Sequence, residues 1–440
     1  MGPNGPQSPY CHDKMKPHIV LKTTSFLTTV DDHSPYWVDF INDKTQLLET
    51  LHPEVDAVLD DHDLRFWVTN EYDPAGDDWS AEERSAGLDR IYRIILQKDY
   101  RLSPDLLQTI RQLPIVENAR RAEVVEAHLP DYRVATSSSL SNAASDLIYL
   151  PFAKMQTRGN PDIKIAVLDT GVNLDHPELE GKIVKRGNFV DLEGLDTTGF
   201  IGNTKDLQAP PEDEVGHGTH VCGIVAAKGL KMDEGVCPDC RLMAVRVLAA
   251  MKSGDRLVGA GIVDNINTGI KWAVDNGADI INMSLGIKHM AGGLPHEDVI
   301  RYALSKNVTI VAASGNDGSP EKYFPGALPG VIAVGAVDNS GQVTPFTSYG
   351  ANIYVVAPGL NIYSSYAHNT YAFASGTSQA SPFVCGAIGL LKSFALEQGR
   401  KLGNEEIRNI LKNCSDKIDN RLRNEKAGYW LRHHDAYDKR

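Results

Sequence analysis

The chain has 440 residues, of which 42% are hydrophobic and 23% are charged, and its formal net charge at pH 7 is −13. This length predicts more than one domain, and the composition is that of a globular protein. The acidic balance lacks the basic surplus that nucleic-acid-binding proteins usually carry, so we expect no nucleic-acid partner.

Cysteine usage and hydropathy bear on the compartment. Residues 1–30 lack the apolar core of a signal peptide, and no stretch looks long and apolar enough to cross a bilayer. The cysteines are too sparse and unevenly spaced for a disulfide framework. We therefore expect a cytoplasmic protein with reduced thiols and no membrane partner. The six cysteines are Cys11, Cys222, Cys237, Cys240, Cys385 and Cys414.

The first third of the chain predicts an extension followed by a small α+β domain. Residues 1–60 are expected to form an N-terminal extension, partly disordered, whose acidic and helical end at 35–61 suits a partner. Residues 61–135 predict a strand, two helices and a closing strand. The predicted elements are a strand at 64–72, a helix at 80–100 opened by a Ser80–Glu83 capping box, a helix at 103–113 capped by Ser103, and a strand at 122–129.

Residues 136–145 are small and polar and predict a linker, after which the hydrophobic pattern of the sequence changes. From 146 to 440, continuous apolar runs of strand length alternate with helical stretches. Such runs suit strands buried on both faces of a parallel sheet, so we expect a doubly wound α/β domain. The apolar runs cover 163–169, 241–248, 278–285, 308–314 and 330–337, and the helical stretches cover 216–227, 258–276 and 295–306.

Four polar residues stand at strand ends or helix starts, where α/β folds place their working groups. Asp169 ends the first apolar run, His217 lies between two glycines, Asn316 follows "VAASG", and Ser378 lies in "SGTSQASP". Each also has a structural interpretation: a loop or capping acid, a structural histidine, a left-handed turn residue and a helix cap.

Together the four residues supply every part that nucleophilic acyl transfer requires. Ser378 would attack a carbonyl carbon, His217 would take its proton and pass it to the leaving amine, and Asp169 would hold the imidazole tautomer. Asn316 and the backbone N–H of Ser378 would stabilise the oxyanion.

The motifs that carry these residues resemble the subtilisin-like serine peptidases from about residue 146 to 440. The matching stretches are "AVLDTGV" (166–172), "GHGTHVCGIVAA" (216–227), "INMSLG" (281–286), "VAASGN" (311–316) and "SGTSQASP" (375–382). The resemblance implies a seven-stranded parallel sheet with helices on both faces and endopeptidase activity on polypeptides through an acyl-enzyme. A peptide transpeptidase or macrocyclase, or a regulated binding scaffold, is the alternative on the same fold.

The resemblance also implies a substrate groove. Ser284, Leu285 and Gly286 resemble the segment that pairs with the substrate backbone and walls the first specificity pocket. The opposing segment would be Gly259, Ala260 and Gly261, so that an extended peptide lies between the two as an added strand. In the segment after Asn316, an acidic residue at 317 would favour a basic substrate side chain, whereas a tyrosine at 323 would fill the pocket. The sequence leaves this choice open.

Subtilases commonly carry an inhibitory prodomain, and residues 103–130 resemble the end of one. This implies a latent precursor that processes itself, with Pro130–Thr136 in the cleft and the N-terminal domain as an internal partner. An unsecreted latent protease must be restrained, so an intracellular regulatory partner is compatible with this interpretation.

Three departures from the family pattern stand out. Gln379 follows the candidate nucleophile where the family usually has methionine, which predicts resistance to peroxide. No cofactor is expected. Some relatives bind calcium through an acid after "HP", here Glu178, but the loop at 228–235 lacks the usual asparagines, so we expect no tight calcium site and no other metal. Cys237 and Cys240 form a lone CxxC, which we interpret as buried small hydrophobes rather than half of a zinc site.

Overall fold

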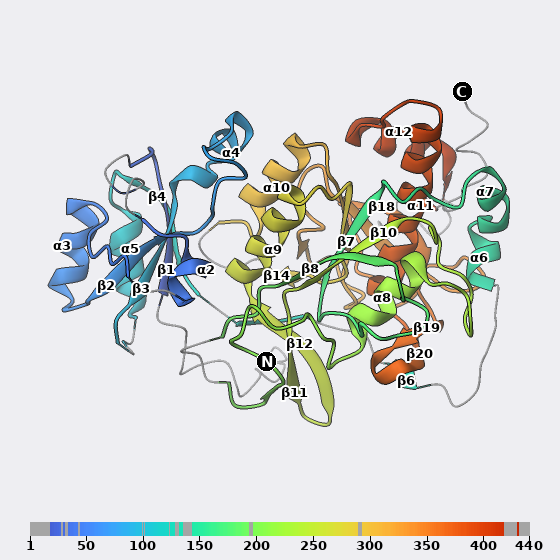
Figure 1. Ribbon diagram of the computed structural model, residues 1–440, viewed down its shortest axis with the longest axis horizontal. Coiled ribbons are helices and arrows are strands. Elements are labelled where there is room, and N and C mark those ends of the chain that lie inside the picture. Colours follow the sequence, from blue (N-terminus) through green and yellow to red (C-terminus); the bar gives the residue numbers. More distant parts are fainter. Residues whose placement is uncertain are drawn as a thin grey trace, which may run out of the picture.

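The structure is a computed structural model in which a smaller N-terminal domain lies beside a larger one (Figure 1). Cys11, part of the predicted linker (136–142) and residues 431–440 lie outside the described residues. The described residues are 18–27, 30, 34–42, 45–98, 100, 102–122, 124–127, 132–134, 143–192, 197–288, 293–417 and 429–430.

The N-terminal domain is a four-stranded antiparallel sheet packed against short helices. Its strand order is β2-β3-β1-β4, and aliphatic side chains of the sheet and of two of the helices form its core. The strands are β1 (His18–Thr23), β2 (Phe66–Asn70), β3 (Ile91–Leu96) and β4 (Val116–Arg121), and the helices are α2 (Trp37–Asn42), α3 (Pro53–Asp61), α4 (Ala81–Ala86), a 3₁₀ turn (Leu88–Arg90) and α5 (Pro104–Arg111).

Two predictions for this domain were wrong. The expected extension 1–60 includes β1, which lies between β3 and β4 in the sheet, so the domain begins no later than His18. The expected helix at 80–100 keeps its capping box but ends at Gly87, whose φ of 77° is left-handed. The β-branched run that follows forms β3 instead, because a strand there completes the sheet. The helix at 103–113 is confirmed as α5, with Ser103 as its N-cap.

The larger domain is built on a sheet whose seven main strands are parallel, as the family resemblance implies. Two two-residue strands extend one edge, β22 (Tyr429–Trp430) parallel to its neighbour and β21 (Asp416–Lys417) antiparallel to β22. The seven strands, in sheet order, are β18 (Ile353–Pro358), β17 (Ile332–Val337), β15 (Thr309–Ala313), β13 (Ile280–Met283), β7 (Lys164–Asp169), β10 (Arg241–Arg246) and β8 (Ile183–Asn188).

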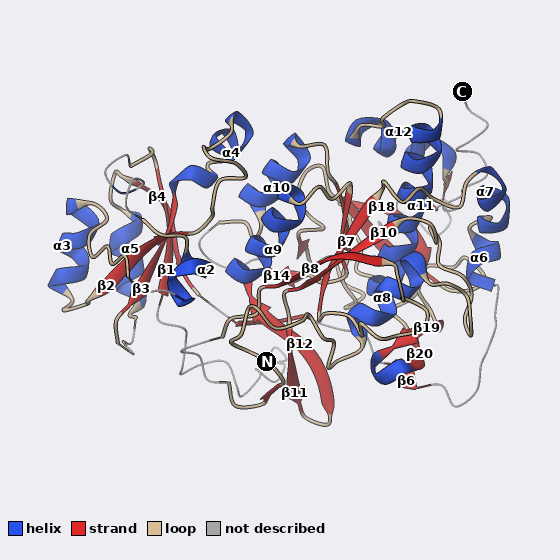
Figure 2. Ribbon diagram, in the orientation of Figure 1, coloured by secondary structure: helices blue, strands red, loops and turns tan. Residues whose placement is uncertain are grey.

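Helices cover both faces of this sheet (Figure 2). Ile165 and Val167 of β7 pack in the same cluster as α8 and α11, whereas Ala166 and Leu168 pack in the cluster of α9 and α10. Alternate residues of one strand thus serve two cores, which is why the strand sequences are continuously apolar. The helices of this domain are α6 (Ala143–Leu147), α7 (Leu150–Gln156), α8 (His217–Ala226), α9 (Val263–Asp275), α10 (Glu297–Ser305), a 3₁₀ turn (Ala367–Asn369), α11 (Thr377–Glu397) and α12 (Asn404–Cys414).

Helix α11 corrects one expectation. By length and composition it could span a membrane, which the sequence analysis did not find, but 89% of its apolar window is buried inside the protein. It is the central helix of one core cluster and begins next to the candidate nucleophile.

Smaller sheets link the two domains. The predicted closing strand forms β5 (Val124–Ala127), but it does not close the N-terminal sheet, since β4 does so. Instead β5 pairs with the larger domain, as does β6 (Tyr132–Val134). Their sheets contain β9 (Phe200–Ile201), β11 (Ala249–Ser253) and β12 (Arg256–Ile262) on one side, and β19 (Ile362–Tyr366) and β20 (Thr370–Ala374) on the other; a further pair is β14 (Ile287–Lys288) with β16 (Tyr323–Phe324).

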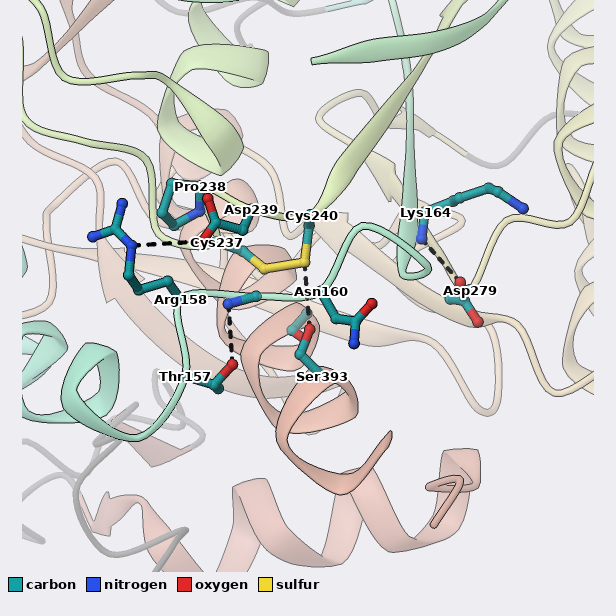
Figure 3. Close-up of a disulfide and its surroundings, with 12 residues drawn as sticks. Thr157, Arg158, Asn160, Lys164, Cys237, Pro238, Asp239, Cys240, Asp279 and Ser393 are labelled. Carbon is teal, nitrogen blue, oxygen red and sulfur yellow. Dashed lines mark hydrogen bonds and ion pairs between the residues drawn. A yellow bond between two sulfur atoms is a disulfide. The ribbon is translucent and has the colours of Figure 1, made fainter. Parts of the chain in front are cut away.

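Cys237 and Cys240 form a disulfide, so the prediction of two reduced thiols was wrong for this pair (Figure 3). The bond is fully buried, and two glycines make room for it. A Cβ atom at Gly159 would lie 2.7 Å from the sulfur of Cys237, and one at Gly389 of α11 would lie 3.0 Å from it. The turn formed by the two intervening residues brings the sulfurs together. The cytoplasmic location stays a prediction.

Candidate active site

The carboxylate of Asp169 and the ring of His217 form a buried hydrogen-bonded pair. Asp169 ends β7 at the carboxyl edge of the sheet, and its Oδ1 lies 2.7 Å from Nδ1 of His217, the first residue of α8. Because a carboxylate only accepts hydrogen bonds, Nδ1 carries the proton and Nε2 is left as a lone-pair acceptor. No partner for Nε2 is found among the described residues.

Two glycines and one acid hold His217 in place. A Cβ atom at Gly216 would lie 2.4 Å from the ring of Tyr366, and one at Gly218 would lie 2.1 Å from a backbone oxygen. The carboxylate of Asp213 accepts hydrogen bonds from the backbone N–H groups of residues 215, 216 and 219 and from the hydroxyls of Thr170 and Thr219. The turn before the histidine is therefore rigidly tied to the end of β7.

Ser378 is the second residue of α11 and is 2% exposed. The N-cap of this helix is Gly376, without a side-chain cap, so the capping interpretation of Ser378 does not hold. Its hydroxyl donates to the carbonyl oxygen of Ser284 at 3.0 Å, and the hydroxyl of Ser284 donates back to the carbonyl oxygen of Ser378 at 2.8 Å. This reciprocal pair ties the start of α11 to the end of β13.

Asn316 reaches the start of the same helix. Its Oδ1 accepts hydrogen bonds from the backbone N–H and the hydroxyl of Thr377, at 2.8 and 2.9 Å. Since a backbone N–H can only donate, these contacts identify the amide oxygen and leave the Nδ2 group free to donate elsewhere. The N–H of Ser378 is among the first four of α11, which have no acceptor within the helix. The two groups are suited to an oxyanion.

An extended strand lies along the predicted groove. Antiparallel to β12, β5 places Ala127 opposite Gly259, Glu126 opposite Ala260, and Val125 opposite Gly261. It also contacts β14, which follows Gly286. Beyond the catalytic residues, β6 pairs with β20, with Tyr132 opposite Ala374. The chain's own segment thus has the added-strand geometry that was expected of a substrate.

Comparisons with known proteins agree with this geometry. The model of the subtilase family matches residues 160–429, which is more than half of the chain. The chain belongs to the subtilase family.

Individual relatives carry the same signal. A thermophilic serine proteinase of Bacillus sp. (strain AK1) is 41% identical over 61% of this chain, and the match spans 60% of that protein's length. An alkaline protease of Alkalihalobacillus alcalophilus is 32% identical over 74% of this chain and 80% of its own length. The solved structure of the prenylagaramide maturation protease PagA matches with a TM-score of 0.54 at 29% identity, covering 66% of this chain and 98% of that one.

The structure settles the packing of Tyr323, which the sequence left open. Its buried ring lies between two segments, because a Cβ atom at Gly286 would come within 3.3 Å of the ring and one at Gly315 within 2.4 Å. Its hydroxyl donates to Asp317 at 2.5 Å, and Lys288 lies 3.1 Å from the same carboxylate. Tyr323 therefore fills the space between Gly286, in the expected pocket wall, and Gly315, and the carboxylate of Asp317 is paired with Lys288.

Some subtilases bind calcium, and the position implied by the family does not fit the ion in this chain. The fully buried carboxylate of Glu178 accepts hydrogen bonds from the backbone N–H groups of Gly229, Leu230 and Lys231, at 2.7–3.0 Å, and from the hydroxyl of Tyr371 at 3.2 Å. Calcium needs six to eight oxygen ligands, whereas this loop turns N–H donors toward the acid. In the described part of the chain, no group of three or more His, Cys, Asp or Glu side chains is arranged to hold a metal ion.

The structure pairs Asp169 with His217, and it ties both Ser378 and Asn316 to the start of α11. Gln379, the neighbour of Ser378, lines one small cavity with His217. Of the expected groove segments, Ser284 contacts Ser378, and Gly259 to Gly261 pair with β5. Two contributors escaped the sequence analysis. Asp213 lies in an acidic stretch that carries none of the motifs named above, and only its position four residues before His217 hinted at its role. Tyr132 was assigned to the cleft segment without a partner, yet its ring lies 4.7 Å from that of Tyr366.

Proposed function

We propose that this subtilase is a serine endopeptidase made as a latent precursor that cuts its own chain between Ala127 and Tyr132. The observation that carries the proposal is the path of that segment. It pairs with β12 before the catalytic residues and with β20 after them. Residues 128–131 lie outside the described residues, so the bond is assigned from the two flanking strands. This interval begins before the segment expected in the cleft, Pro130–Thr136, and overlaps it only at residues 130–132.

The catalytic roles follow from the atoms present. The Ser378 oxygen bonds to the substrate carbonyl carbon as its proton moves to Nε2 of His217, whose other nitrogen stays bonded to Asp169. The carbonyl oxygen becomes an oxyanion that the amide of Asn316 and the N–H of Ser378 stabilise. His217 then gives its proton to the amine nitrogen as the C–N bond breaks. An ester on Ser378 is left, together with a free amine.

For this step the Ser378 hydroxyl must turn from the carbonyl of Ser284 toward His217. The starting bond is an ordinary neutral hydrogen bond, worth only about 0.5–1.5 kcal/mol net. Rotation of the Ser378 hydroxyl therefore costs little when a substrate carbonyl enters the site. No metal takes part in these steps.

Latency rests on contacts between the N-terminal domain and the surface next to the groove. Asp264 of α9 lies 3.2 Å from His18 and also pairs with Arg120, and Lys271 lies 2.9 Å from Glu83. Apolar side chains of both domains join one cluster that includes Tyr72 and Trp79. The N-terminal domain can therefore stay bound and block the groove after the chain is cut, as an internal partner. The block ends when this domain dissociates or a regulatory partner removes it.

An active-site label tests the nucleophile directly. A fluorophosphonate forms a covalent bond with an activated serine, and peptide mapping locates the adduct. We expect it on Ser378 in the processed enzyme, together with cleavage of a polypeptide substrate to products with free carboxylates. Ser378→Ala should remove both the label and the cleavage, whereas the exposed control Ser340→Ala should remove neither. Persistent labelling of Ser378→Ala would contradict the proposal, and products joined to an amine would favour the transpeptidase.

A further inference from the structure

Gln379 directly follows Ser378 in the first turn of α11 and is fully buried. Its side chain lines a cavity of about 10 Å³ together with His217, Tyr132 and Tyr366. Neither its amide oxygen nor its amide nitrogen has a hydrogen-bond partner among the described residues. His217 lines the same cavity, and its Nε2 atom also lacks a hydrogen-bond partner among the described residues.

Burying a side-chain amide without hydrogen-bond partners lowers the stability of the folded protein. Each unpaired polar group costs about 1–3 kcal/mol relative to a hydrogen-bonded one. A methionine or leucine would fill the same space without that cost. The amide therefore points to a polar partner that does not belong to this chain and that can both donate to Oε1 and accept from Nε2.

The position of the cavity indicates which partner this is. Tyr132 reaches it from β6, and β6 follows the predicted cut. The cavity thus lies on the side from which the new amine departs. Once the amine has left, the second nucleophile enters from this side and must meet Nε2 of His217. The cavity is about large enough for one water molecule.

We propose that Gln379 positions the water molecule that hydrolyses the acyl-enzyme; this inference rests on the proposed function. The water gives one proton to Nε2 of His217 while its oxygen bonds to the ester carbon on Ser378. Its second hydrogen is donated to Oε1 of Gln379, and the Nε2–H group of Gln379 donates to the water oxygen. The bond from carbon to the Ser378 oxygen then breaks, that oxygen takes the proton from His217, and a carboxylic acid leaves.

This arrangement favours water over larger nucleophiles. An amine could also give a proton to His217, but its carbon substituent would compete for the small space beside Gln379. The side chain therefore directs the acyl-enzyme toward hydrolysis and away from transfer to an amine.

The test measures how the acyl-enzyme divides between water and an added amine. The processed enzyme is given a peptide ester together with glycinamide, and mass spectrometry gives the ratio of amide to acid product. Pre-steady-state kinetics gives the acylation and deacylation rates separately. For Gln379→Met we expect about a tenfold higher amide-to-acid ratio and about tenfold slower hydrolysis, with acylation within about twofold of wild type. The control Gln398→Met, at the exposed far end of α11, should match wild type.

The readouts separate this role from others. A structural role would slow acylation and deacylation together without moving the ratio, and a contact to the departing segment would slow acylation alone; either result overturns the inference. Gln379→Ala provides a second variant if the methionine variant does not fold, with the same expected direction. If wild-type enzyme forms no acyl-enzyme, the proposed function fails and this inference fails with it.

Discussion

Glu126 of β5 lies opposite Ala260 of β12, in the middle of an antiparallel register that runs from Val124 to Ala127. The groove expected to bind a substrate backbone is thus filled by the chain itself. Main-chain hydrogen bonds fix the position and direction of such a strand, so β5 lies where the backbone of a substrate was expected to pair. Our proposal of a latent precursor that processes itself rests on this one relationship.

The first prediction concerns the strength of the contact between the N-terminal domain and the larger domain. Asp264 is fully buried; burial alone would raise its pKa, but Arg120 and His18 outweigh this and hold the pKa below its usual range. Asp264→Asn should weaken the contact between domains by about 3 kcal/mol, because it leaves the buried His18 and the partly buried Arg120 without their carboxylate partner. Size-exclusion chromatography after processing should show earlier loss of the N-terminal fragment. Glu180→Gln, which removes an exposed ion pair with Lys228, is the control and should release the N-terminal fragment at the wild-type rate.

The second prediction concerns acid sensitivity. Burial lowers the pKa of His220 to about 3, with a smaller contribution from His217, and burial together with Arg120 lowers that of His296 to about 3. The unfolded chain takes up these protons near pH 6.5 and the folded chain does not. Stability is therefore complete above that pH and falls as the pH drops from about 6.5 toward 3, by up to about 1.4 kcal/mol per unit for each residue.

Denaturant unfolding of Ser378→Ala at several pH values checks this slope without interference from autolysis. His296→Gln should make the slope shallower, whereas His368→Gln, at an exposed position, should not. A free energy of unfolding that does not change between pH 7 and 5 would be inconsistent with neutral buried histidines.

The third prediction concerns the first specificity pocket. Tyr323 fills the space between Gly286 and Gly315, so we expect wild-type enzyme to prefer small uncharged side chains before the scissile bond and not to favour lysine or arginine. Tyr323→Ala should raise kcat/KM for substrates with phenylalanine at this position by about 10–100-fold. Lys322→Ala, at the exposed neighbouring position, is the control and should keep the wild-type substrate profile. Equal profiles for wild type and Tyr323→Ala would place the pocket elsewhere.

The fourth prediction concerns the acid that relatives use for calcium. The carboxylate of Glu178 accepts hydrogen bonds from three backbone N–H groups. Addition of calcium or EDTA should therefore cause no change in the unfolding temperature that depends on Glu178. Glu178→Gln should lower the free energy of unfolding by about 1.5–3 kcal/mol, the range for hydrogen bonds to a charged group. Calorimetry of both proteins with and without EDTA measures the two effects. A calcium-dependent shift that Glu178→Gln abolishes would show that the loop binds the ion after all.

Residues at strand ends were the easiest to predict, and pairings across domains were the hardest. Asp169 and Asn316 could be found because parallel strands bring their carboxyl ends to one edge. His217 and Ser378 stand at helix starts, where the glycines near them marked the positions. By contrast, β1 pairs with strands about 70–100 residues away, and β5 pairs with β12 more than 130 residues away. Nothing in the local sequence of these segments identifies such partners.

Packing also decided two questions that composition could not. Whether Tyr323 or Asp317 shapes the pocket depends on Lys288, which neutralises the acid from a neighbouring strand. The pairing of Cys237 with Cys240 depends on the turn between them and on the room left by glycines at 159 and 389. The cost of burying Gln379 was likewise visible only once its surroundings were known.

Intact-mass measurement of freshly made wild type and Ser378→Ala over time tests the central claim most directly. We predict that wild type separates into two fragments whose new ends lie between Ala127 and Tyr132, while Ser378→Ala stays whole. Identical behaviour of the two proteins, or a cut outside that interval that still requires Ser378, would contradict the account of a groove filled by the chain's own cleavage segment.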